Sequence, residues 1–591
     1  MKKQVSLLLT HGWLSLVFGM SVWVFFGYFY RYHLIYQEQY QLFLFSSDYM
    51  TETVGRIGGA ADYVSRFLTQ FYHTPWVGAL LIALLLTALQ RLVAGIARHI
   101  GGKATLHAPL SFLPSIAYGA LLCDEHYMLT GVVAVTGVVA AFRAGLSIRR
   151  AERRVAFELA MIPALYVLAG GAAAVFVLLC FLPEVKAGVP GRKGRLLAVA
   201  GGGFLLLLMP LAAQYVFTQY PLAKLWTGGD YYRFPTVFPF PLLLLWLSIP
   251  AVALCLLRSQ GEKKAGEGWW RTALWAGGLA LAVTGGVYRM SDWKKEEVMR
   301  YDHYARTRQW ERIISRADHR TPTSPLSVSL LNLALCKTGR MPDWMFHYFQ
   351  NGPEGLLPSF TRDFSAPMMA GEIYYHLGFI NTAQRFAFEA MEAIPDFQRS
   401  ARAVKRLAET NLLNGHYDVA RKYLRLLQQT LYYRSWATET LACLSDETQI
   451  EANPEWASLR KYRTRTDFLF SEEEKDMMLG ILLQQDFSNR PAYEYLMAYC
   501  LLTKDLEHFY RYYPLGESLR YRTIPTSYQE ALIYIWGQLH NTTTNIPYPI
   551  SDPVKRRVLE YRRIYVNHLH AEPLLRGPFS DTYWYYLHFR K

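Results

Sequence analysis

Long apolar segments fill the first half of the chain and are almost absent from the second half. Eight of them precede residue 290, at positions 8–30, 76–97, 108–123, 127–146, 157–182, 195–218, 236–257 and 269–288. A helix of about 20 apolar residues is long enough to cross a bilayer. The pattern therefore predicts an all-α, polytopic protein, with a transmembrane helix bundle over 1–290 and a water-exposed domain over 291–591.

The second half shows the spacing of amphipathic helices, interrupted by short polar or proline-containing stretches. Small, aromatic and leucine residues recur there at the spacing of a tetratricopeptide unit. They are Gly371, Tyr374, Gly378, Ala383, Ala390 and Pro395, and then Leu407, Ala408, Gly415, Ala420 and Leu427. Small residues let paired helices approach closely, so we expect a TPR-like α-solenoid that could bind a protein or peptide partner.

The distribution of Lys and Arg predicts an orientation. If every segment crosses once, twelve of these residues lie inside and eleven outside, which is no bias. If 157–182 re-enters as a hairpin, the count becomes eighteen inside and nine outside. Basic residues gather on the cytoplasmic side, so we expect about seven net crossings plus the hairpin. The N-terminus would then be cytoplasmic and the C-terminal domain periplasmic, in a bacterial inner membrane, with a single crossing of 157–182 as the alternative.

Overall composition excludes some classes of function. The net charge is +15, but the basic residues fit cytoplasmic loops, and no nucleic-acid-binding signature accompanies them. The six cysteines show neither zinc-ligand spacing nor the pattern of a disulfide framework. Nucleotide-binding loops, serine-hydrolase elbows, zinc-protease motifs and calcium-binding loops are absent from the sequence. We therefore expect no nucleic acid and no motif-bound metal.

Two loops are unusually polar and aromatic, and on the preferred topology both face outward. The first is the external loop 31–75, with Glu38 and Asp48 as candidate catalytic carboxylates. The second supplies the candidate substrate-binding residues, which are Lys224, Asp230, Tyr231, Tyr232 and Arg233. Together they could hold phosphates of a lipid-linked substrate and, in an enzyme, a divalent cation. The alternative is a pair of interfacial loops whose charges are simply solvated, which is also the expectation for the turn 124–126.

Several short stretches resemble a known family. They are residues 371–378 (GEIYYHLG) and 381–385 (NTAQR), together with 67–71 (FLTQF) and 231–234 (YYRF). These resemble an uncharacterised family of bacterial polytopic membrane proteins with a tetratricopeptide-like C-terminal domain. The resemblance implies architecture without an activity.

The layout also resembles the lipid-linked sugar transferases called the GT-C class. That class has a long first external loop bearing an acidic residue, and some members end in a tetratricopeptide tail. Here Arg31, Tyr32 and His33 directly follow the first span, and the first carboxylate is Glu38.

The sequence is therefore compatible with two functions. The leading expectation is a scaffold or envelope-assembly protein whose outward helical-repeat domain binds a protein partner. The alternative is a GT-C-like glycosyltransferase that uses a polyprenyl-phosphate-linked sugar donor. A transporter is less favoured, because few charged residues lie within the spans.

The charge count leads to a test of topology. A C-terminal alkaline phosphatase fusion should be active and a C-terminal green fluorescent fusion dark, because the first reporter folds only outside and the second only in the cytoplasm. Enzyme activity and fluorescence in whole cells are the measurements. The reverse pattern would mean eight simple crossings and a cytoplasmic C-terminal domain.

Overall fold

The computed structural model is all-helical. It describes residues 2–101, 108–185, 192–217, 219–234, 240–258, 277–278, 281, 285–361, 365–394, 399–464, 468 and 470–590, and these contain no β-strand. The chain divides into two compact units. The first unit comprises Met1–Glu296 together with Pro395–Ala401 and Gln429–Tyr432, and the second comprises the remainder.

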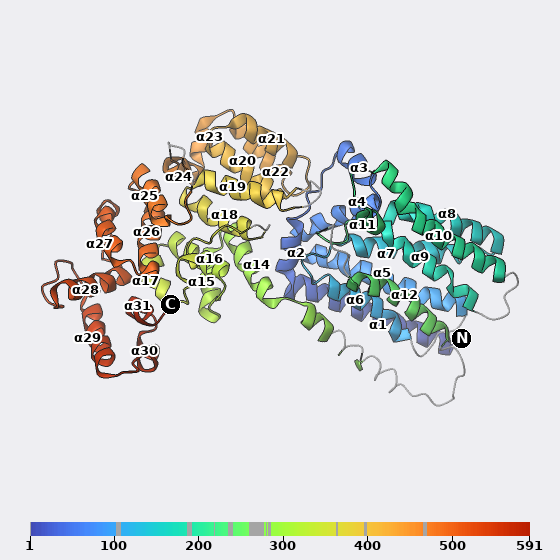
Figure 1. Cartoon of the computed structure of the whole chain (residues 1–591), viewed down its shortest axis with the longest axis horizontal. Helices are drawn as coiled ribbons and strands as arrows, with labels where there is room; N and C mark the ends of the chain where they lie inside the picture. The colour runs from blue at the N-terminus through green and yellow to red at the C-terminus, as the bar shows by residue number, and fades with distance from the viewer. Residues whose placement is uncertain are drawn as a thin grey trace. The chain divides into compact units, whose positions relative to one another are not determined.

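The first unit consists of long apolar helices joined by short polar ones (Figure 1). Its α-helices are α1 (Lys2–Val24), α2 (Arg31–Glu38), α3 (Ser47–Val54), α4 (Gly59–Thr69), α5 (Pro75–Gly101), α6 (Leu113–Leu121), α7 (Thr130–Gly145), α8 (Ala151–Ala169), α9 (Ala173–Cys180), α10 (Arg192–Val216), α11 (Leu222–Thr227) and α12 (Phe240–Arg258). Short 3-10 or π-helical turns connect several of them.

Five helical segments among the described residues are long and apolar enough to cross a membrane. They are Gly12–Phe29, Pro75–Ile100, Ala151–Cys180, Leu196–Val216 and Phe240–Leu257. These segments indicate a membrane protein. They coincide with five of the eight expected spans.

The other three expected spans have different outcomes. The apolar helices Leu110–Leu121 and Thr130–Gly145 are shorter than a span needs, and buried side chains fix α7 among its neighbours. A helix of 16 residues rises only about 24 Å, which is less than the hydrocarbon thickness. Most of 269–288 lies outside the described residues.

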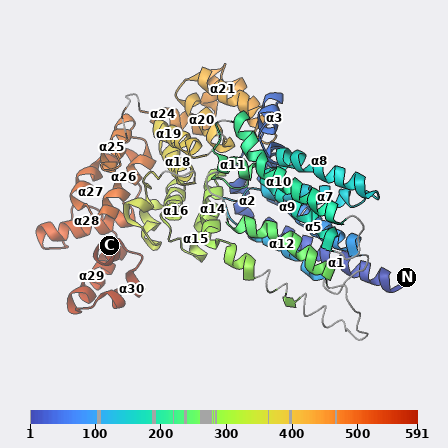
Figure 2. The same ribbon diagram turned by 45° about the vertical axis from the view of Figure 1, so that its right-hand side comes forward.

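The chain reverses within the apolar segment 151–180. α8 ends at Ala169, the next three residues form a 3-10 turn, and α9 runs back beside α8. Gly170 occupies this turn with a φ of +68°, a conformation that favours glycine. Phe176 on α9 lies 6.0 Å, ring centre to ring centre, from Phe142 on α7. α7, α8, α9 and α10 lie side by side in both views (Figure 1, Figure 2).

The segments that connect the helices lie at two opposite ends of this bundle. At one end, Gly58 donates its backbone N–H to Val167 O (2.8 Å), and Met128 donates to Tyr231 O (2.9 Å). The first bond joins the segment after α3 to the end of α8, and the second joins the segments after α6 and after α11. At the other end, His99 contacts Leu146 O through Nε2 (2.7 Å), which joins the ends of α5 and α7. The polar loops singled out from the sequence therefore share one end of the bundle.

The second unit is built from shorter helices. They are α14 (Trp293–Arg306, whose first turn belongs to the first unit), α15 (Trp310–His319), α16 (Pro325–Lys337), α17 (Met341–Trp344), α18 (Ser365–Leu377), α19 (Ile380–Glu392), α20 (Ala401–Leu413), α21 (Tyr417–Leu427), α22 (Arg434–Cys443), α23 (Glu447–Ala452), α24 (Pro454–Tyr462), α25 (Lys475–Gln485), α26 (Arg490–Thr503), α27 (Leu506–Tyr512), α28 (Thr526–His540), α29 (Asp552–Asn567), α30 (Glu572–Phe579) and α31 (Tyr583–Phe589).

Helices occupy both positions of the sequence repeat. α18 packs against α19, and a Cβ added to Gly371 would lie 3.5 Å from Phe386 Cβ, so the small residue sits at a close helix contact. Ala383 on α19 and Ala420 on α21 are fully buried. Pro395 lies outside the described residues. The likeness to a tetratricopeptide repeat stays a prediction.

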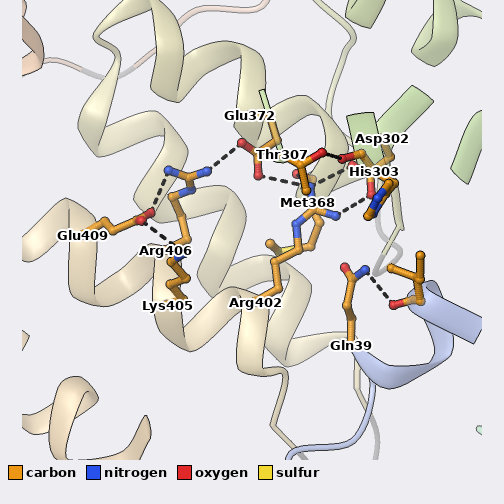
Figure 3. A network of polar contacts seen from close by, with 11 residues as sticks. Gln39, Asp302, His303, Thr307, Met368, Glu372, Arg402, Lys405, Arg406 and Glu409 are labelled. Atoms are coloured by element: carbon orange, nitrogen blue, oxygen red, sulfur yellow. Dashed lines mark hydrogen bonds and ion pairs between the residues drawn. The ribbon is translucent and has the colours of Figure 1, made fainter. Parts of the chain in front are cut away.

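A buried ion network ties three helices of the second unit together (Figure 3). Arg402 on α20 makes a forked contact to Asp302 on α14, with both distances 2.8 Å, and also reaches Glu372 on α18 (3.1 Å). Arg406 donates to Glu372 (2.7 Å) and to Glu409 (2.9 Å). Burial raises the pKa of Glu372, but the two arginines outweigh it and hold that pKa below its usual range. The network is internally paired, as buried charges require.

Candidate functional site

Two of the short helices between α1 and α5 begin with specific caps. The Glu296 carboxylate accepts the backbone N–H of Tyr32 (2.9 Å) and of His33 (2.8 Å) at the start of α2. The Ser46 hydroxyl accepts the N–H of Tyr49 at the start of α3 (3.3 Å). Such acceptors satisfy the N–H groups that a helix leaves unpaired in its first turn. These caps position the first polar loop as a set of rigid helices.

Three glycine-containing turns meet where the second polar loop packs. A Cβ added to Gly58, which precedes α4, would lie 2.5 Å from Gly229 N. A Cβ on Gly170, in the turn between α8 and α9, would lie 2.6 Å from the same atom. Both glycines have positive φ, and no side chain fits between these backbones. The loop after α11 is thereby fixed against α4 and against the α8–α9 turn.

A buried cluster of two acids and two bases lies beside this contact. Asp230 accepts from Arg66 Nη2 on α4 (2.8 Å) and from Lys224 Nζ on α11 (2.5 Å), using a different oxygen for each. Its backbone N–H donates to both carboxylate oxygens of Asp62 on α4, at 3.0 and 3.3 Å. All four side chains are buried. We call these four residues the charge cluster.

The two carboxyl groups of the charge cluster titrate differently. Burial and the neighbouring Asp230 carboxylate raise the pKa of Asp62 to about 7. Burial also raises the pKa of Asp230, but Lys224 and Arg66 more than offset it, and its pKa lies below the usual value. Asp230 is therefore ionised at neutral pH, whereas Asp62 exchanges a proton near neutrality.

A cavity of about 220 Å³ opens next to the charge cluster. It is lined by Gln41, Leu42, Leu44, Ser46, Asp48, Tyr49, Glu52, Thr53, Arg56, Arg66 and Arg399. Three arginines thus meet two carboxylates in one space. We call it the arginine cavity. A second, much smaller cavity of about 20 Å³ is also lined by Arg56, together with Asp62, Lys224 and Asp230 among others.

One buried donor at the arginine cavity, Gln41 Nε2, has no hydrogen-bond partner among the described residues. The Tyr49 hydroxyl and the Arg66 guanidinium, which also line the cavity, interact with each other. Guanidinium groups are strong hydrogen-bond donors to the oxygen atoms of anions. Three of them around one space are therefore suited to an anion with several oxygen atoms.

Segments far apart in the sequence complete the wall of this cavity. Leu42 donates its N–H to Arg399 O (3.0 Å), and Phe45 donates to Gln429 O (2.8 Å). The His73 ring stacks on Tyr432 with ring centres 4.5 Å apart. Residues 399–401 and 429–432 therefore belong to the first unit and hold the chain that precedes α3.

Asp48 and Glu38, the two candidate catalytic carboxylates of the first loop, lie in different environments. Asp48 lines the arginine cavity on α3. Glu38 is buried at the end of α2 and is not among the residues that line this cavity. No group of three or more His, Cys, Asp or Glu side chains suited to a metal ion occurs among the described residues.

The predicted residues of the second loop divide between two locations. Lys224 and Asp230 belong to the charge cluster. Tyr231 donates its hydroxyl to Ala169 O, and Tyr232 contacts the ring of Tyr127. Arg233 reaches the first loop at Tyr40, where its Nη1 donates to the hydroxyl (2.9 Å) and its guanidinium lies over the ring. The cavity and cluster thus use Arg56, Arg66 and Arg399, to which the sequence patterns assign no site role.

The turn after α6 carries its own ion pairs. Glu125 accepts from Lys295 Nζ (2.7 Å) and lies 3.3 Å from His126 Nε2. The backbone carbonyl of His126 accepts from Arg233 N (2.7 Å). The residues 124–126 therefore act in packing the second loop.

Fold and site together indicate a membrane protein with an arginine-lined cavity at one end of its helix bundle. The family model described as "Family of unknown function (DUF6057)" matches residues 6–590, so the chain belongs to this family. Neither a curated protein nor a solved structure matches it.

Backbone contact at Gly170 leads to a stability prediction. Gly170→Ala should destabilise the protein by about 1–3 kcal/mol, because the new methyl group meets Gly229 and the φ is unfavourable. Thermal unfolding of the purified protein in detergent is the measurement. Gly137→Ala on α7 is the control, since no atom lies within 4 Å of the added Cβ. Equal melting temperatures for the two variants would contradict the described turn.

Proposed function

We propose that this protein is a GT-C-like glycosyltransferase that takes its sugar from a polyprenyl-phosphate-linked donor. The observation that carries the proposal is the arginine cavity, in which Arg56, Arg66 and Arg399 share one space with Asp48 and Glu52. Guanidinium groups make forked contacts to phosphate, and a carboxylate can act as a general base. A site for sugar transfer from a lipid phosphate needs both.

The proposed roles follow from charge and burial. Arg66 would bind the donor phosphate most strongly, because it is buried and electrostatic attraction is stronger away from water. Arg56 and Arg399 would contact the remaining phosphate oxygens. Glu52 pairs with Arg56 at 3.0 Å and is largely exposed, so Asp48 is the better candidate base.

The proposed step balances as follows. An acceptor hydroxyl attacks the anomeric carbon of the donor, and the new C–O bond forms while the C–O bond to the phosphate breaks. Asp48 takes the hydroxyl proton. Polyprenyl phosphate leaves with the bonding electron pair, and the arginines stabilise the charge that develops on it.

Charge distribution supports an outward-facing site. Arg143 at the end of α7, and Arg149, Arg150, Arg153 and Arg154 before and within α8, lie at the bundle end opposite the cavity. Basic residues favour the cytoplasmic side. We therefore assign the cavity and the second unit to the periplasmic side of a bacterial inner membrane, where the acceptor would be met.

Donor turnover tests the proposal. In nanodiscs with a fluorescent polyprenyl-phosphate hexose, the wild-type protein should bind the donor and release polyprenyl phosphate. Asp48→Asn should retain binding but lose at least about 100-fold in turnover, because a general base contributes about that much. Arg66→Lys should bind more weakly although it keeps the charge.

Glu52→Gln is the matched control, since it changes a carboxylate in the same cavity that the proposal leaves without a catalytic role. It should turn over within about twofold of the wild type. Absence of donor binding, or full turnover in Asp48→Asn, would overturn the enzyme assignment.

A second candidate function is protein binding by the second unit, as in a scaffold with a TPR-like repeat. It is favoured by an exposed aromatic surface, where Trp344 stacks on His347 with ring centres 5.3 Å apart and Phe349 lies under Arg590. Trp344 is 45% exposed and Phe349 is 37% exposed. Exposed Trp and Arg side chains are common centres of protein interfaces.

Site-specific photo-crosslinking tests this second candidate. A crosslinker at position 349 should give one discrete adduct in cells, and Trp344→Ala should remove it without changing the protein level. Lys422→Ala on α21 is the surface control. An adduct that persists in Trp344→Ala would contradict binding at this surface.

A further inference from the structure

The charge cluster is connected to the arginine cavity through a single side chain. Arg66 lines the cavity and also donates to Asp230. Its Nη2 donates to Asp230, and the guanidinium also interacts with the side chain of Tyr49, which lines the same cavity. The guanidinium is therefore anchored by Asp230 and lies at the cavity wall.

We propose that Asp230 and Asp62 are positioning residues for the anion site. Asp230 holds the Arg66 guanidinium at the cavity wall, and the protonation state of Asp62 sets the net charge of the charge cluster next to the cavity. This inference rests on the proposed anion binding in the cavity but not on sugar transfer. Neither carboxylate would contact the ligand.

Asp230 is suited to this anchoring role. Its two oxygens receive Arg66 and Lys224 from different helices, at 2.8 and 2.5 Å, so the carboxylate is held between two fixed cations. Its backbone is held in turn by Asp62. A guanidinium fixed in this way loses little conformational entropy when an anion binds.

Asp62 is suited to the tuning role. When both carboxylates are ionised, the two acids and two bases of the charge cluster balance. When Asp62 is protonated, the cluster carries one net positive charge next to the cavity. An anion in the cavity favours the protonated form, so binding should take up a proton.

Charged or titratable groups face Asp62 from each neighbouring segment. Arg66 lies one turn along α4, Lys224 comes from α11, and Asp230 and Tyr231 come from the loop that follows. Arg56, which precedes α4, lines the small cavity with Asp62 and acts on the charge of Asp230. Since burial and Asp230 raise the pKa of Asp62 to about 7, the change of charge falls within the physiological range. Affinity should be high below this pH and should fall as the pH rises through it.

Sulfate binding measures this coupling, because the charge of sulfate is constant between pH 6 and 8. Calorimetry on the full-length protein in detergent should show sulfate binding that weakens on the order of tenfold from pH 6 to pH 8. Asp62→Asn should bind tightly at both pH values, since the amide is neutral and similar in shape. Asp230→Asn should bind weakly at both, because Arg66 loses its anchor.

Four comparisons separate the possible failures. Lys422→Ala, on the exposed face of α21 and outside the cavity, should keep the wild-type pH profile. If the wild type binds sulfate through Arg66 but Asp62→Asn keeps the wild-type profile, the tuning role is wrong while the anion site stands. If sulfate binding is absent, or unchanged in Arg66→Lys, the anion site itself is wrong. A folded Asp230→Asn protein with wild-type affinity would overturn the anchoring role.

Discussion

The buried carboxylate of Asp230 is the constraint on which the arrangement of the first unit depends. A buried negative charge persists only where cations and hydrogen-bond donors compensate its lost hydration. Arg66 and Lys224 supply the cations, and they come from α4 and α11, which meet at one end of the apolar bundle. Electrostatic compensation therefore selects one packing of the polar loops, where hydrophobic burial alone would permit several.

The second unit compensates its buried charges in a different way. There, Arg402 and Arg406 stand one turn apart on a single helix and share Glu372, and every charged side chain in the set has a partner. In the first unit, by contrast, Arg66 also lines a cavity. This difference distinguishes an ion network enclosed among helices from one that borders a cavity.

Hydropathy alone was sufficient to predict the membrane character of the first half, because a spanning helix must be long and apolar. It did not separate α6 and α7, which are shorter apolar helices, from the five longer segments; the buried side chains of α7 are apolar because protein surrounds them. The reversal at Gly170 could be anticipated from its glycine pair and the charge bias. Composition also pointed to both polar loops and to Asp48, Lys224 and Asp230.

The pairing of these loops could not be read from the sequence. Arg66 and Asp230 are distant in the chain, and no periodicity relates them. Arg399 could not have been assigned to the cavity, because it lies between the two repeat units in the sequence, and its backbone contact with Leu42 is set by the fold. Local patterns record which residues are polar, whereas the identity of their partners is a property of the three-dimensional fold.

The composition of the cavity wall has a consequence for biosynthesis. Arg66 is translated long before Asp230, and Arg399 emerges later still, after the helix bundle has entered the membrane. Until then Arg66 has no carboxylate partner that compensates the hydration it loses on burial. α4 must therefore remain hydrated at the membrane surface while the later helices insert. Closure of the cavity is thus among the last steps of assembly, and a chain truncated before residue 399 would lack part of the cavity wall.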